Sequence, residues 1–337
     1  MPEVTQATLF SLPKELIDII FSHLSMNDFY SLMRVSRGSN AFVHDPFFWQ
    51  KLFVKRVRVD HFDAMIAQLS KWRHLRILHL NYFEWVISGP MIGQVVDACP
   101  QLVELKVTAC VTRWENDMMT SLSRLTNLKK LFVESNSVAF APSFTIPALK
   151  CWSGLRVLEF KEMWHNPPTN RPYDGPYEII DLDGMVKQIG LSHGSTLRTL
   201  KIDFPFLSGR VNLLSSVSLK FISEHCPNLE SLGLQRVTST DQHSPIQLSL
   251  LESFTIKFNS YNPEIHSLSA LESMLGIADG NTELALPKLK ECLVVLGCFG
   301  MSHKGKAAFG RMKKRANFRL SMTRCSCHNN NRAEVPW

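Results

Sequence analysis

The sequence predicts an α/β fold in which a short N-terminal helical segment precedes a solenoid with a curved parallel sheet inside and helices outside. Three observations predict this fold. The spacing Leu-x-x-Leu-x-apolar recurs along the middle of the chain, and segments with apolar residues three and four positions apart separate its copies. Residues 9–53 lack this spacing and instead carry three short helical patterns.

The N-terminal segment begins with a helical pattern whose apolar residues share one face, and these are Leu16, Ile19, Ile20 and Leu24. Pro13 fits the first turn, where its missing N–H costs nothing. A second pattern covers residues 29–35, and a third covers residues 46–53 after a cap at Asp45. About 45 residues bury too little surface for comfortable stability, yet Ile17, Phe21 and Phe47 lie off these stripes. We interpret this apolar surplus as an interface.

This segment resembles the F-box family. The residues that carry the resemblance are Leu12-Pro13-x-Glu15-Leu16, Ile19, Ile20, Leu24, Asp28, Leu32, Val35-Ser36 and Asp45-x-x-x-Trp49. Ser39 departs from the family pattern, which usually has an aromatic residue there. The resemblance implies docking on a Skp-type adaptor that leads to a cullin-based ubiquitin ligase. The implied adaptor-binding residues are Leu12, Pro13, Leu16, Ile19, Ile20, Leu24, Leu32, Val35 and Trp49.

The repeated spacing begins after residues 54–70, which we expect to form a helical connector. Its eight copies start at Leu75, Leu102, Leu128, Leu155, Leu197, Leu229, Leu251 and Leu289. The first three steps between copies are 27, 26 and 27 residues. Alternating apolar residues predict a strand with one buried face, and one strand with one helix must stack on neighbouring units to bury that face.

The repeats resemble the leucine-rich-repeat family over residues 71–297, with Cys110, Asn136 and Asn259 at the position where that family has Asn or Cys. The resemblance implies a solenoid with a curved parallel sheet, and it says almost nothing about the ligand. Residues 161–184 are rich in proline and aromatic residues, which predicts a long loop inserted in the solenoid.

The residues between the leucines are expected to line the concave face of the sheet. Acids and lysines are balanced there, which favours a protein target over a polyphosphate. The candidate target-binding residues are Lys106, Lys130, Phe132, Val157, Glu159, Trp164, Tyr173, Tyr177 and Lys201.

The last segment, residues 301–337, carries nine Lys or Arg residues and one acid, so its net charge is +8, and the other 300 residues carry −1 of the +7 of the whole chain. We expect a disordered basic tail. Arg311-Met312-Lys313-Lys314-Arg315 also fits a nuclear-import signal or a nucleic-acid patch, and elsewhere the chain shows no basic excess that would predict nucleic-acid binding.

Catalytic and metal signatures do not support an enzyme, and we predict no cofactor and no metal. Gly190-Leu191-Ser192-His193-Gly194 matches Gly-x-Ser-x-Gly, but a nucleophile elbow needs a strand before the serine and a helix after it. Cys325, Cys327 and His328 lack the second ligand pair of a zinc site. An esterase using Ser192 is the enzymatic alternative.

The resulting prediction is a non-catalytic substrate receptor of a ubiquitin ligase, whose alternative is a repeat scaffold outside any ligase. Short, interrupted apolar runs predict no membrane span, and scattered cysteines favour reduced thiols in the cytoplasm or nucleus.

Overall fold

One parallel sheet organises the chain. The computed structural model describes residues 11–22, 24, 26–43, 50–57, 61–83, 88–109, 116–135, 151–152, 154–162, 181–203, 214–237, 246–258, 271–275, 286–296, 303–316 and 318–324. In these ranges ten strands pair in chain order, each parallel to its neighbours. The strands are β1 (Lys51–Val57), β2 (Ile77–Phe83), β3 (Glu104–Ala109), β4 (Lys130–Ser135), β5 (Val157–Glu162), β6 (Thr199–Asp203), β7 (Ser231–Val237), β8 (Ser253–Phe258), β9 (Glu291–Leu296) and β10 (Arg319–Arg324).

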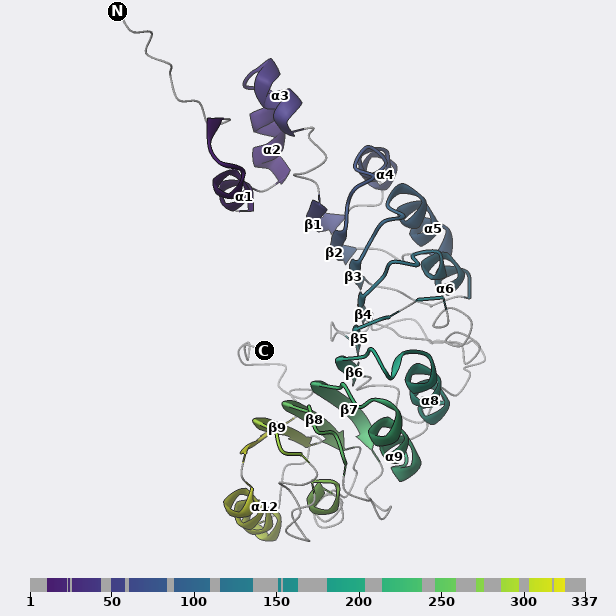
Figure 1. Cartoon of the computed structure of the whole chain (residues 1–337), viewed down its shortest axis with the longest axis vertical. Coiled ribbons are helices and arrows are strands. Elements are labelled where there is room, and N and C mark those ends of the chain that lie inside the picture. The colour runs from purple at the N-terminus through teal and green to yellow at the C-terminus, as the bar shows by residue number, and fades with distance from the viewer. Residues whose placement is uncertain are drawn as a thin grey trace, which may run out of the picture.

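The sheet curves into an arc with helices on its outer side (Figure 1). These helices are α4 (Phe62–Leu69), α5 (Gly89–Ala98), α6 (Asn116–Ser123), α8 (Leu182–His193) and α9 (Ser216–His225). Side chains of the local sequence cap the N-termini of two of these helices. The Ser88 hydroxyl accepts a hydrogen bond from the N–H of Met91 at the start of α5, and the Asp181 carboxylate accepts one from Gly184 in α8.

The eight copies of the repeated spacing coincide with strands β2–β9, so the predicted parallel sheet is confirmed. In β3, Leu105 and Val107 are buried, whereas Glu104 and Lys106, which alternate with them along the strand, stay partly exposed. The leading leucine of the same copy, Leu102, is buried under the strand. Burial of one such side chain contributes about 1.5–3 kcal/mol, and the stacked units share one continuous apolar core.

The N-terminal helices are α1 (Lys14–Ser22), α2 (Met26–Met33) and α3 (Arg37–Val43), and the first two coincide with predicted helical patterns. Strand β1 covers residues 51–57. The predicted third helix over 46–53 is therefore wrong for residues 51–53, and the predicted helical connector is wrong for residues 54–57. Leu52 is buried and Val54 half-buried, whereas Lys51 and Phe53 are exposed. This alternation suits a strand, and β1 extends the sheet beside β2.

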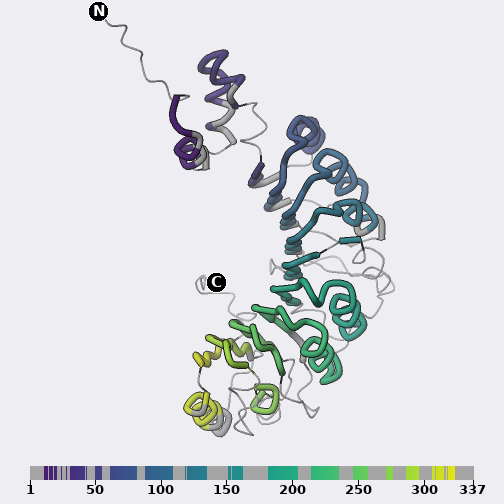
Figure 2. Tube along the Cα trace, viewed as in Figure 1, coloured from purple at the N-terminus to yellow at the C-terminus, as the bar shows by residue number. Residues whose placement is uncertain are grey.

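The C-terminal segment contradicts the expectation of a disordered tail over two stretches. Helix α12 (His303–Arg315) and strand β10 form there, and β10 pairs with β9. Phe309, Met312, Phe318 and Leu320 are buried, so these elements cover the end of the core. Figure 2 shows α12 at the end of the arc opposite the N-terminal helices.

Several predictions fall outside the described residues. These are Phe47, Trp49, the inserted loop from 163 to 180 with Trp164, Tyr173 and Tyr177, and the candidate ligands Cys325, Cys327 and His328. Residues 161–162 belong to β5 and 182–184 to α8, so the predicted loop boundaries were too wide. Within the described ranges, no helix is long and apolar enough to cross a membrane, and no three His, Cys, Asp or Glu side chains lie close enough to hold a metal ion.

Candidate functional site

Helix α1 presents apolar side chains to solvent. Leu16, Ile19 and Ile20 are 48%, 57% and 36% exposed. Their spacing of three and four residues places them on one side of the helix, which we name the α1 face. Ile17 lies about one quarter-turn away from Leu16 and is buried in the core that also contains Val43 and Leu52. The α1 face is therefore an apolar surface that the chain itself leaves largely uncovered.

The other predicted adaptor-binding residues divide into two groups. Leu12, Leu24 and Leu32 are half-buried and pack against the core, so their role is at least partly structural. Pro13 is exposed beside the α1 face, and Val35 is 72% exposed in the turn between α2 and α3. The interpretation of Ile17 as interface surplus is wrong, because this residue anchors α1 to the core; the side chain of Phe21 lies outside the described set.

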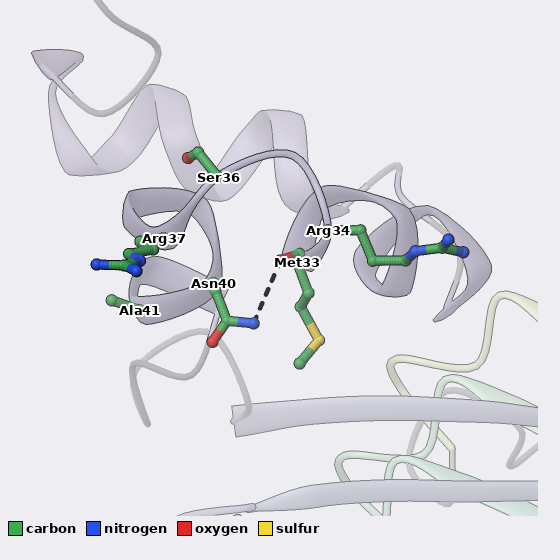
Figure 3. A pocket seen from close by; sticks show the side chains of 6 residues that line it. All are labelled: Met33, Arg34, Ser36, Arg37, Asn40 and Ala41. Atoms are coloured by element: carbon green, nitrogen blue, oxygen red, sulfur yellow. Dashed lines mark hydrogen bonds between the residues drawn. The ribbon is translucent and has the colours of Figure 1, made fainter.

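A shallow hollow of about 400 Å³ lies at the turn from α2 to α3 (Figure 3). Asn40 Nδ2 donates to the Met33 carbonyl oxygen at 3.2 Å across it, while Arg34 and Arg37 extend to opposite sides. The Ser36 hydroxyl caps α3 by accepting from the N–H of Ser39 at 3.0 Å. Ser39 is buried with its hydroxyl 2.8 Å from that of Ser36, so a small polar residue fills the place where an aromatic was expected. Ser36 and Ser39 therefore stabilise the turn from α2 to α3.

The concave face of the sheet carries a network of ion pairs between neighbouring strands. The Glu104 carboxylate lies 2.8 Å from His79 Nε2 and 3.0 Å from Lys130 Nζ. Lys106 pairs with Glu134 at 3.2 Å, and Lys201 pairs with Glu159 at 2.9 Å. Four of the predicted target-binding residues, Lys106, Lys130, Glu159 and Lys201, therefore already hold opposite charges from the chain itself.

Glu104 is the most enclosed acid of this network, with 12% of its side chain exposed. Burial raises its pKa, but hydrogen bonds from Lys130 and His79, together with the charges of both, outweigh burial and lower the pKa below its ordinary value. The carboxylate therefore stays ionised at neutral pH and fixes both basic neighbours.

The apolar candidates of the concave face sit within this charged network. Phe132 pairs in register with Lys106 on one side and Glu159 on the other, and Val157 lies between Lys130 and Thr199. Both side chains are half-buried. Further along, a Cβ at Gly233 would lie 3.0 Å from Cγ of Lys201, so the glycine leaves room for that lysine to lie across β7.

Phe53 is a surface residue that the sequence analysis missed. It is 52% exposed on β1 and its ring meets that of His79 edge-on, with centroids 4.6 Å apart. The alternation of Leu52, Phe53 and Val54 could have revealed this position, because buried neighbours on both sides place Phe53 on the opposite face.

Ser192 is the candidate nucleophile of the esterase alternative. Ser192 lies inside helix α8, and its hydroxyl accepts from Gln188 Nε2 at 3.1 Å, which is not the strand-to-helix turn of a nucleophile elbow. Burial raises the pKa of Cys99 to about 12 and that of Cys226 to about 11, so both thiols remain protonated at neutral pH.

A comparison with known protein families gives the class of the N-terminal segment. Residues 9–55 match the F-box-like family, and the chain therefore carries an F-box-like domain at its N-terminus. The α1 face lies inside this domain.

A particular relative is the ubiquitin ligase complex F-box protein UFO1 of Saccharomyces cerevisiae, which is 38% identical over 88 residues. The match covers 22% of this chain and 13% of UFO1. Among solved structures, the yeast complex of Rad7 and Elc1 aligns with 95% of this chain and 74% of its own matched chain, at 14% identity and a TM-score of 0.33.

Proposed function

We propose that this protein is the substrate-recognition subunit of an SCF-type E3 ubiquitin ligase. The α1 face within the F-box-like domain carries this proposal, because three large aliphatic side chains on one helix face remain exposed there. The similarity of part of the chain to UFO1, itself an F-box protein of a ubiquitin ligase complex, also supports it.

In this proposal the F-box-like domain binds a Skp-type adaptor, and a cullin joins through the adaptor. Leu16, Ile19 and Ile20 make the central apolar contact, and the exposed Pro13 and Val35 extend it. Burial of apolar surface contributes roughly 25 cal/mol per Å², so several such side chains supply a few kcal/mol of affinity. The protein contributes no reacting group, and ubiquitin transfer takes place on other subunits.

The sheet region has the second role in the proposal. We assign it to leucine-rich repeats that begin after the F-box-like domain and hold a protein target on the concave face. The buried leucines at the repeated spacing and the in-register parallel strands support the assignment. Phe132 and Val157 are the proposed apolar contacts for the target, and the predicted aromatic residues Trp164, Tyr173 and Tyr177 would add to them.

The proposal is tested by purifying the tagged full chain from cells and identifying its partners by mass spectrometry, in cytoplasmic and nuclear fractions separately. We expect a Skp-type adaptor and a cullin at near-stoichiometric amounts in at least one fraction. Adaptor and cullin should both be lost when Leu16 and Ile20 are replaced by Asp. Recovery of a folded chain without either protein would contradict the proposal and favour a scaffold that acts outside a ligase.

A further inference from the structure

A basic surface runs along the edge of the sheet where the chain enters strands β2–β6. The five turns that lead into these strands cover residues 70–77, 99–104, 124–130, 151–157 and 194–199, and we name this surface the basic stripe. It contains eight Lys or Arg residues and one acid, Glu104. The next two turns, 226–231 and 248–253, carry Glu230 and Glu252 and no Lys or Arg, so the positive charge ends at β6.

Backbone hydrogen bonds align the basic residues of the stripe. Each residue that directly precedes a strand donates its N–H to the carbonyl of the equivalent residue one strand earlier. The distances are 2.7 Å from Lys129 to Val103, 2.7 Å from Arg156 to Lys129, and 2.8 Å from Arg198 to Arg156. Since adjacent strands lie about 4.8 Å apart, three cations follow one another at that interval.

Gly154 leaves room for the side chain of one of these cations, Lys129. Gly154 has φ +82, and a Cβ there would lie 3.2 Å from Lys129 Nζ. The ammonium group of Lys129 is therefore held beside the turn that leads to Arg156, which concentrates positive charge at β4 and β5.

Part of the charge on the stripe is neutralised within the chain. Arg124 pairs with Asp97 at 2.6 Å, Lys130 pairs with Glu104, and Arg198 pairs with Glu230. Arg73, Arg76 and Arg156 are exposed and have no ion pair among the described residues. Lys129 and Arg156 precede the neighbouring strands β4 and β5, where like charges repel each other, so an anionic ligand would relieve a cost that the folded chain otherwise carries.

The surroundings of the stripe favour a polypeptide over a nucleic acid. Ile77 and Val157 directly follow Arg76 and Arg156 in the chain and are half-buried, so they add apolar side chains where the stripe borders the concave face. Trp72 and Trp152 of these turns are buried and cannot stack on bases.

We propose that the basic stripe, with Ile77 and Val157, binds an extended segment of the target protein that is rich in Asp and Glu and contains interspersed apolar residues. The inference rests on the proposed function in that it names the class of segment the receptor recognises. Arg76 and Arg156 are its main charge contacts, and guanidinium groups suit carboxylates because they donate two parallel hydrogen bonds.

Fluorescence anisotropy with the full chain tests this proposal. The probe is a labelled 15-residue peptide of repeating Glu-Glu-Leu, and the control peptide has Gln in place of Glu. We expect Arg76→Glu with Arg156→Glu to weaken binding of the Glu peptide at least tenfold, and Arg76→Gln with Arg156→Gln to weaken it less. The matched control, Lys313→Glu with Lys314→Glu on α12, makes the same change in net charge and should alter binding less than twofold.

Several results would overturn the proposal. These are equal binding by the wild type and the Arg76/Arg156 variants, equal weakening by the α12 control, or equal affinity for the Gln peptide. Tighter binding of a single-stranded or duplex DNA 15-mer that also depends on Arg76 and Arg156 would instead assign the stripe to nucleic acid. Adaptor capture by the same proteins separates this outcome from the proposed function, because the stripe variants leave the α1 face unchanged.

Discussion

The α1 face and the concave face of the sheet differ in how far the chain itself pairs or covers their side chains. On the concave face, charged side chains of neighbouring strands pair with one another, and the alternating leucines behind them are buried. On α1, one aliphatic residue, Ile17, reaches the core while Leu16, Ile19 and Ile20 face solvent. The sheet is thus largely complete within the chain, whereas α1 displays apolar surface that a second protein can cover.

This difference has a simple geometric origin. A strand has two faces, so strict alternation divides buried from exposed residues. A helix of nine residues has apolar positions on more than one side, and the core covers only the side that carries Ile17. Stability and binding should therefore depend on different residues.

The largest effect on stability should come from uncovering the end of the sheet. Removal of residues 303–337 deletes α12 and β10, which exposes the edge of β9 and the core beneath Phe309 and Met312. We expect the melting temperature to fall by about 10 °C or more and aggregation to increase, because terminal units shield a solenoid core. Differential scanning fluorimetry and light scattering measure both; an unchanged melting temperature would show that the end needs no cover.

A matched pair of leucine substitutions compares the two regions directly. Leu131 in β4 is fully buried, and Leu16 on α1 is 48% exposed. Leu131→Ala should lower the free energy of unfolding by about 2–5 kcal/mol, whereas Leu16→Ala should change it by about 0.5 kcal/mol or less. Urea denaturation followed by circular dichroism provides the comparison, and equal losses would contradict the separation.

A smaller effect should follow from the concave ion-pair network. Glu104→Gln removes the carboxylate shared by His79 and Lys130, and we expect a loss of about 1 kcal/mol at pH 7. The folded protein lowers the pKa of Glu104, so its stabilising contribution is present above the ordinary value of 4.5 and disappears as the pH falls through the lower folded pKa.

The stability difference between wild type and Glu104→Gln should therefore shrink on acidification. Denaturation curves at pH 7 and at about pH 3 test the sign. Ser123→Ala provides a control, because its hydroxyl donates to the Thr120 carbonyl oxygen at an exposed site and should give a smaller, pH-independent change. A difference that grows in acid would refute the assigned direction.

The sheet was predictable from the sequence because the repeated spacing carries both alternation and unit length. Strands β1 and β10 were missed since their leading positions hold Trp49 and Asn317 in place of leucine, although Leu52 with Val54 and Leu320 with Met322 keep the remaining spacing. A search that required only the last two apolar positions would have found both.

The sequence predicts that α1 carries surplus apolar residues, but it does not predict which side of the helix faces solvent. Apolar residues at 16, 17, 19 and 20 span about 160° of the helix circumference, so periodicity alone cannot tell which part of that arc meets the core. The ion pairs of the concave face were also hidden, because partners such as Lys201 and Glu159 are 42 residues apart and meet only through strand register.

The most direct test of the account is adaptor capture by matched double variants of the full chain. Leu16→Asp with Ile20→Asp places charges on the α1 face, and Leu191→Asp with Val217→Asp places the same charges on exposed aliphatic residues of α8 and α9. Both variants should melt within about 2 °C of the wild type. The affinity for a purified Skp-type adaptor should fall at least a hundredfold in the first variant and stay within twofold in the second, as measured by biolayer interferometry. Undiminished adaptor binding by a folded Leu16/Ile20 variant would contradict the account.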